Sequence, residues 1–141
     1  MAAAGHAMGL RLTWGAALAL VVASAVVPAV AGPAEPRWSH ERTVVFTFAL
    51  TLIAMVSGIG SLALRETLVR AVDNGSVDLR SPEGAGYERA ILRRAWALCG
   101  TVGLLGWFVA WIAAAPALAW PYAVGAMALL LFHAPRRLEG R

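Results

Sequence analysis

The 141-residue chain has no lysine, a single cysteine and little charge of either sign. Charged residues make up 14% of it, whereas soluble domains carry about 25%. The lone cysteine, Cys99, excludes an intrachain disulfide. Hydrophobic residues account for 60% of the chain and the mean hydropathy is +0.68. These values indicate a helical integral membrane protein.

Four apolar segments approach the length of about 20 residues that a helix needs to cross a bilayer. They cover residues 12–31, 44–64, 95–115 and 117–133, and the last is the shortest. The first three contain no charged residue and no histidine. Proton or cation coupling normally requires an ionisable group within the membrane, so this absence argues against it. We predict an all-α membrane protein, one transmembrane domain over residues 1–141, built as a four-helix bundle of two hairpins.

The first apolar segment also has features of a cleavable signal peptide. Arg11 precedes the apolar run, and Pro28 with the small residues of 29–31 ends it. The same run is long enough to remain as an uncleaved span. Both interpretations stay open: the chain has four spans if residues 1–31 are retained and three if they are removed.

Residues 65–94 form the main polar segment, with six arginines and five acidic residues. Ser81 suits a helix N-cap, and Pro82 suits the first helical position. Gly75, after Asn74, is a typical helix-ending signal. We therefore expect a helical hairpin that projects from the membrane. It could dock a cytoplasmic partner or an anionic lipid, or it could be a solvated hairpin of mixed charge.

The arginines are distributed unevenly between the two sides of the membrane. Ten lie in the N-terminal segment, residues 65–94 and the C-terminal segment, whereas only Arg37 and Arg42 lie between the first and second spans. The positive-inside rule places the ten in the cytoplasm. All-arginine basic usage with abundant alanine, glycine and valine is typical of a GC-rich bacterial genome, so we predict a bacterial inner membrane with a cytoplasmic C-terminus. The expected lipid head-group contacts are Arg93, Arg94, Arg136 and Arg137.

Small residues recur at the spacing of one helical turn in the third segment. Such rows allow helix backbones to approach closely in lipid. The row predicts either packing inside the bundle or an interface with a partner or a second copy. Its members are Gly103, Gly106, Ala110 and Ala114.

The second hairpin carries the stretches "RRAWALCGTVGLLGWFVAW" and "PALAWPYAVGAMALLLFHAPRR". Over this last third, the chain resembles a loose group of small bacterial four-helix integral membrane proteins. The resemblance implies a membrane location and a four-helix plan, and no activity. The double-hairpin plan also looks like the proteolipid subunit of rotary ATPases. That family's proton-carrying role does not transfer, because its mid-membrane carboxylate is absent here.

His133 is the one candidate for chemistry in the fourth segment. It could be a proton-sensitive gate or a metal ligand, or simply the last side chain of a helix that leaves the membrane. We favour the last interpretation, because His6 and His40 are too distant in sequence to form a ligand motif.

We accordingly expect no catalytic residue, cofactor, metal or nucleic acid. The expected partners are the lipid bilayer and either a membrane protein or further copies of the chain. The leading functional hypothesis is a non-catalytic accessory or structural subunit of a membrane complex. The alternative is an oligomeric small-molecule or ion transporter or channel without an intramembrane carboxylate. Its hydroxyl side chains would share one face: Thr47, Thr51, Ser57, Ser61 and Thr101.

Overall fold

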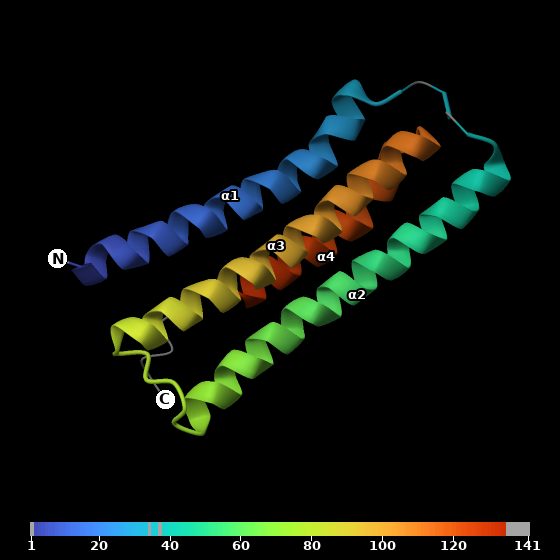
Figure 1. Ribbon diagram of the computed structural model, residues 1–141. Helices are drawn as coiled ribbons and strands as arrows, with labels where there is room; N and C mark the ends of the chain where they lie inside the picture. The colour runs from blue at the N-terminus through green and yellow to red at the C-terminus, as the bar shows by residue number, and fades with distance from the viewer. Residues whose placement is uncertain (1, 34, 37, 135–141) are drawn as a thin grey trace.

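The computed structural model describes residues 2–33, 35–36 and 38–134. All regular elements in these ranges are helical, and each long helix runs back along the one before it (Figure 1). The elements are α1 (Ala2–Ala31), α2 (His40–Asp73), α3 (Pro82–Ala113), the 3-10 helix η1 (Pro116–Leu118) and α4 (Ala119–Phe132).

Three of the helices are long and apolar enough to cross a membrane by length and composition. They are Gly9–Ala31 within α1, α2 and α3. The remaining apolar helical stretch, Pro116–Phe132, is shorter. The 14 residues of α4 reach only about 21 Å at 1.5 Å per residue, against a hydrocarbon core of about 30 Å. The fold is therefore that of an all-α, multi-pass membrane protein.

Local sequence signals set the ends of the α2–α3 hairpin. Asn74 caps α2, and Gly75 follows with a left-handed φ of 72°, which glycine adopts without steric cost. Ser81 caps α3, because its hydroxyl accepts a 3.0 Å hydrogen bond from the Gly84 N–H. Pro82 occupies the first turn. The helix boundaries expected from these residues are confirmed.

The connection between α3 and α4 differs from the expectation. The third apolar segment was expected to remain helical to residue 115, but α3 ends at Ala113 and Ala114 takes a left-handed φ of 50°. Pro116 explains this early end. A residue that precedes proline is disfavoured in the helical region, and Ala115 is accordingly extended, at φ −128° and ψ 88°.

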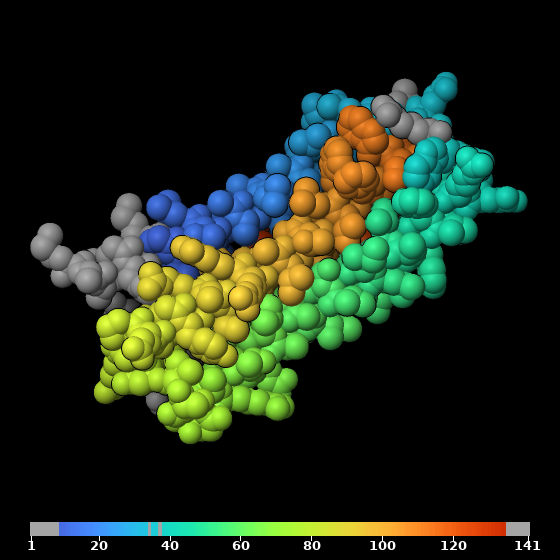
Figure 2. Space-filling view, viewed as in Figure 1, coloured from blue at the N-terminus to red at the C-terminus, as the bar shows by residue number. Residues whose placement is uncertain are grey.

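The central helix of the bundle is α3, which contacts α1, α2 and α4. The helices α1 and α2 flank it on opposite sides and make no contact with each other in the described part of the chain (Figure 1). In the space-filling view, α1, α3 and α2 form one face and largely hide α4 (Figure 2). The core lies where α1, α3 and α4 meet, and it includes Val21, Ala25, Trp96, Cys99, Val102, Ala126 and Leu130.

Candidate functional site

The C-terminal end of α4 is the most concentrated polar feature within the bundle. The last carbonyl groups of a helix have no partner inside the helix and must be satisfied from elsewhere. Each of the three long helices, α1, α2 and α3, supplies one side-chain donor to this end of α4. We call the three donors the collar: Trp14 Nε1 donates to the Leu130 carbonyl at 2.9 Å, the Arg65 guanidinium donates to the Phe132 carbonyl, and Trp96 Nε1 donates to the His133 carbonyl at 3.0 Å.

The backbone bonds of this last turn explain why the collar is needed. The His133 N–H donates to the Leu129 carbonyl at 2.9 Å, and the Ala134 N–H donates to the Leu131 carbonyl at 3.2 Å. The next residue in the sequence is Pro135, which has no backbone N–H to offer. Every remaining carbonyl from Leu130 to His133 is therefore satisfied by a collar side chain.

Arg65 makes a second contact at this end of the bundle. Its guanidinium carbon lies 4.1 Å from the centre of the Phe132 ring, within the range of a cation–π interaction. One turn further along α2, Arg70 pairs with Glu66 at 2.5 Å on the exposed surface. Arg65 is thus engaged with α4, whereas the neighbouring charges pair within α2.

His133 is buried, with 1% of its surface exposed. Its Nε2 lies 3.3 Å from the Ser61 hydroxyl oxygen, and that hydroxyl donates to the Gly58 carbonyl at 2.7 Å. Because the Ser61 proton is committed to Gly58, the hydrogen-bond pattern assigns the ring proton to Nε2. The other ring nitrogen, Nδ1, is buried without a hydrogen-bond partner among the described residues.

The expectation for His133 was right about its place and wrong about its surroundings. It does follow the last residue of α4, but its side chain points into the bundle rather than toward the membrane surface. The reason is that α4 ends beside residues of α2 and α3 that are still inside the bundle. Trp96 of α3 is likewise only 1% exposed.

A second polar contact joins α2 and α4 nearer the opposite end of α4. Thr51 Oγ1 donates to the Thr47 carbonyl at 2.7 Å. The Tyr122 hydroxyl lies 2.5 Å from the same Thr51 oxygen, so Tyr122 acts as the donor. Hydrogen bonds therefore join α2 to α4 near both ends of α4, through Thr51 at one end and through Ser61 and Arg65 at the other.

The predicted row of small residues lies inside the chain, between α3 and its neighbours. A Cβ atom on Gly103 would lie 3.0 Å from the Ser24 hydroxyl of α1, and one on Gly106 would lie 2.5 Å from the Tyr122 Cβ of α4. Ala110 is also buried, whereas Ala114 lies beyond the end of α3. Since α1 and α4 cover this face, a partner protein has no access to it in this structure.

The hydroxyl residues proposed for a shared pore face do not form an exposed polar stripe. Ser57 and Ser61 are buried, and Thr51 meets Tyr122. Thr101 donates back to the Ala97 carbonyl of its own helix at 3.0 Å. The hydroxyl groups of Thr51 and Ser61 therefore join α2 to α4 within one chain.

The predicted lipid contacts fall into two groups. Arg93 and Arg94 lie exposed on α3, one turn before Trp96. Arg136 and Arg137 lie outside the described residues. Sequence reasoning did not identify Arg65, Trp14 or Tyr122 as interhelical donors. The sequence signal that could have indicated a need for such donors is Pro135, which has no backbone N–H to offer the last turn of α4.

The arrangement is suited to holding helices together. Among the described residues, no group of three or more histidine, cysteine or acidic side chains could hold a metal ion. An apolar cavity of about 310 Å³ lies between α1 and α4, lined by residues that include Val22, Val26, Trp120 and Met127.

No protein-family model, curated protein or solved structure matches the chain.

Proposed function

We propose that this chain is a non-catalytic, four-span protein of a bacterial inner membrane, and that it serves as an accessory or structural subunit of a membrane complex. The observation that carries the proposal is the large exposed apolar surface of α2. Of its 34 residues, four are buried: Ala54, Ser57, Ser61 and Leu68.

These four residues lie on one stripe of α2, and many of the large apolar side chains on its other sides face outward. Val45 and Val56 are 68% and 70% exposed. In a membrane, such a surface contacts either lipid or another helix, because neither choice leaves a polar group unsatisfied. The small-residue face of α3 is already occupied by α1 and α4, so the outward face of α2 is the surface we assign to a partner.

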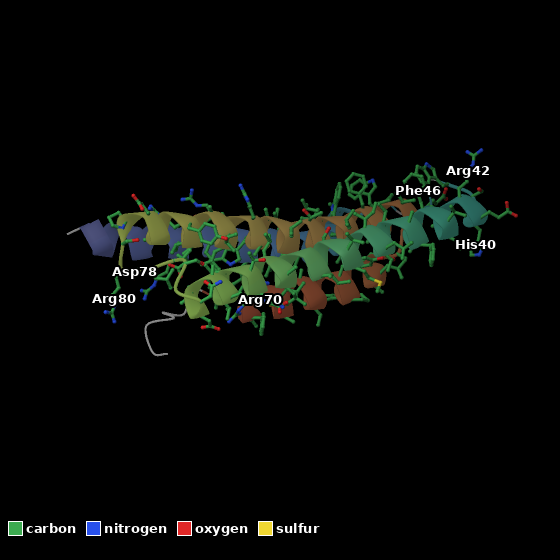
Figure 3. The ribbon with its side chains drawn as sticks, turned by 60° about the horizontal axis from the view of Figure 1, so that its bottom comes forward. His40, Arg42, Phe46, Arg70, Asp78 and Arg80 are labelled. Atoms are coloured by element: carbon green, nitrogen blue, oxygen red, sulfur yellow. The ribbon has the colours of Figure 1, made fainter. Side chains whose placement is uncertain are left out.

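The four-span arrangement is supported by the collar and by the distribution of charge. The collar satisfies the carbonyls of α4, which allows a short helix to end within or at the edge of the membrane. Arg70, Asp78 and Arg80 lie at one end of the bundle, and His40 and Arg42 lie at the other (Figure 3). We place the arginine-rich hairpin end in the cytoplasm by the positive-inside rule.

Two reporter fusions test this topology. A reporter that is active only in the cytoplasm should be active after Arg141 and inactive between α1 and α2. A reporter that is active only in the periplasm should give the opposite pattern. Periplasmic activity of the fusion after Arg141 would contradict the proposed orientation. Equal activity of both fusions in one compartment would contradict the count of four spans.

The partner face can be tested by photo-crosslinking in intact membranes. A photoreactive residue at Val56 should give a discrete protein adduct of constant mass, and the adduct should persist when the complex is purified. The matched control is Leu104, which is also exposed but lies on α3. Adducts with lipid alone at Val56 would refute the accessory role. An adduct whose mass equals two copies of the chain would favour an oligomer instead.

A further inference from the structure

Four arginines lie at nearly the same depth along the bundle, on three different helices. The register follows from two contacts of α3: Gly100 meets Leu20 of α1, and Leu98 meets Gly60 of α2. We call the four arginines the belt. They are Arg11 on α1, Arg65 on α2, and Arg93 and Arg94 on α3.

The depth of each arginine can be counted from these contacts. Arg65 is five residues beyond Gly60, and Arg93 is five residues before Leu98, so the two antiparallel helices bring them level. Arg11 is nine residues before Leu20, and Arg93 is seven before Gly100. At 1.5 Å per residue, this difference amounts to only about 3 Å along the axis.

The belt coincides with the edge of the apolar segments. Arg11 immediately precedes the segment 12–31, Arg65 immediately follows 44–64, and Arg94 immediately precedes 95–115. This is the depth at which the phosphate groups of the surrounding lipid would lie. Arg11, Arg93 and Arg94 are exposed, and the structure gives none of them an ion pair with a described residue.

Acidic side chains are concentrated further from the apolar segments. Beyond the belt, residues 66–92 carry five acids, Glu66, Asp73, Asp78, Glu83 and Glu88, against three arginines, Arg70, Arg80 and Arg89. The one acid beside the belt, Glu66, is paired with Arg70. The hairpin therefore has a positive base and a negative tip.

We infer that the belt binds anionic phospholipids in preference to zwitterionic ones, with the acidic tip held away from the membrane surface. The inference rests on the proposed insertion of the bundle into a bilayer. A guanidinium group can donate two parallel hydrogen bonds to a phosphate. The occupant is lipid rather than an acidic protein segment, because the belt lies on three different helices at the membrane edge, where lipid surrounds the protein and three of the four arginines are exposed.

The test is the relative association of spin-labelled phosphatidylglycerol and spin-labelled phosphatidylcholine with the full chain in phosphatidylcholine bilayers. One basic residue near an anionic surface is worth about 1 kcal/mol, or about fivefold. We expect a preference of about that size for phosphatidylglycerol, because the measurement averages the belt with other positions around the protein. In Arg93→Gln/Arg94→Gln, the ratio should fall toward one.

The matched control is Arg80→Gln/Arg89→Gln, which removes two arginines of the hairpin tip that lie outside the belt and should leave the ratio unchanged. A second measurement uses the unaltered protein at about 1 M salt, where the screening length falls to about 3 Å and the preference should shrink. Equal association of the two lipids with the unaltered protein, or equal loss in both double variants, would overturn the inference. If neither labelled lipid associates with the chain, the proposed membrane insertion itself fails.

Discussion

Replacing Gly106 by alanine should separate α3 from α4. The added Cβ would lie 2.5 Å from the Tyr122 Cβ and 2.9 Å from its Cγ. The Tyr122 Cβ is fixed by the backbone of α4, so a change of side-chain rotamer cannot move it away. Relief therefore requires a shift of α4, which also disturbs the hydrogen bond between Tyr122 and Thr51.

Two opposing terms decide the size of the effect. Glycine to alanine inside a helix gains about 1 kcal/mol of intrinsic helix stability. Overpacking of a tight contact costs about 1–3 kcal/mol. We expect Gly106→Ala to lower the free energy of unfolding by up to about 2 kcal/mol once the helix term is subtracted.

Other glycines of the same bundle supply a graded comparison. A Cβ on Gly125 would meet nothing within 4 Å, and one on Gly100 would make only an ordinary 3.5 Å contact with Leu20. Alanine at either position should leave stability unchanged or raise it. Gly103→Ala should fall between these and Gly106→Ala, because its nearest neighbour, the Ser24 hydroxyl at 3.0 Å, can rotate.

The assay is unfolding in mixed micelles, followed by tryptophan fluorescence as the share of denaturing detergent rises. The four alanine variants are compared with the unaltered chain at one protein concentration. From most to least stable, we expect the alanine variants of Gly125 and Gly100, then that of Gly103, then that of Gly106. If Gly106→Ala is as stable as Gly125→Ala, the close approach of α3 and α4 is not present in the folded protein.

Two further substitutions test the hydrogen bonds of the bundle in the same assay. Trp96→Phe keeps an aromatic ring but leaves the buried His133 carbonyl without its donor, so it should lower the free energy of unfolding by about 1–3 kcal/mol. The control is Trp120→Phe, at an exposed tryptophan. An equal loss of stability in both variants would contradict a special role for the collar. Tyr122→Phe removes one interhelical hydrogen bond, which in membrane proteins is worth about 0.6 kcal/mol on average. Combined with Thr51→Val it should cost little more than either change alone, whereas fully additive losses would show that the two hydroxyl groups do not interact.

The helices and their ends could be predicted from the sequence because the signals are local. Apolar segments of spanning length define the helices, and Ser81 and Gly75 act on backbone groups within three residues of themselves. The expected end of α3, at residue 115, lies two residues beyond the observed end at Ala113. Pro116 disfavours the helical conformation at the residue before it, and Ala115 is accordingly extended. Each of these features depends on a short stretch of chain.

The collar could not be predicted in the same way, because it depends on which helices become neighbours. Trp14 and its acceptor Leu130 are 116 residues apart, and Arg65 and Phe132 are 67 apart. Tryptophan and arginine near the ends of apolar segments are usually explained by the membrane interface. Only the arrangement of helices in space shows that three such side chains turn inward to one helix end.

The position of that helix end links the collar to the belt. Arg65 belongs to both: its guanidinium donates to the last turn of α4, and its place on α2 is level with Arg93 of α3. The end of α4 therefore lies at the depth where the apolar segments of the other helices end. The last carbonyl groups of a short helix placed in this way accept hydrogen bonds from indole and guanidinium donors. In hydrocarbon, each carbonyl left without a donor would cost several kcal/mol. Long donor side chains on α1, α2 and α3 thus make the limited length of α4 compatible with a membrane.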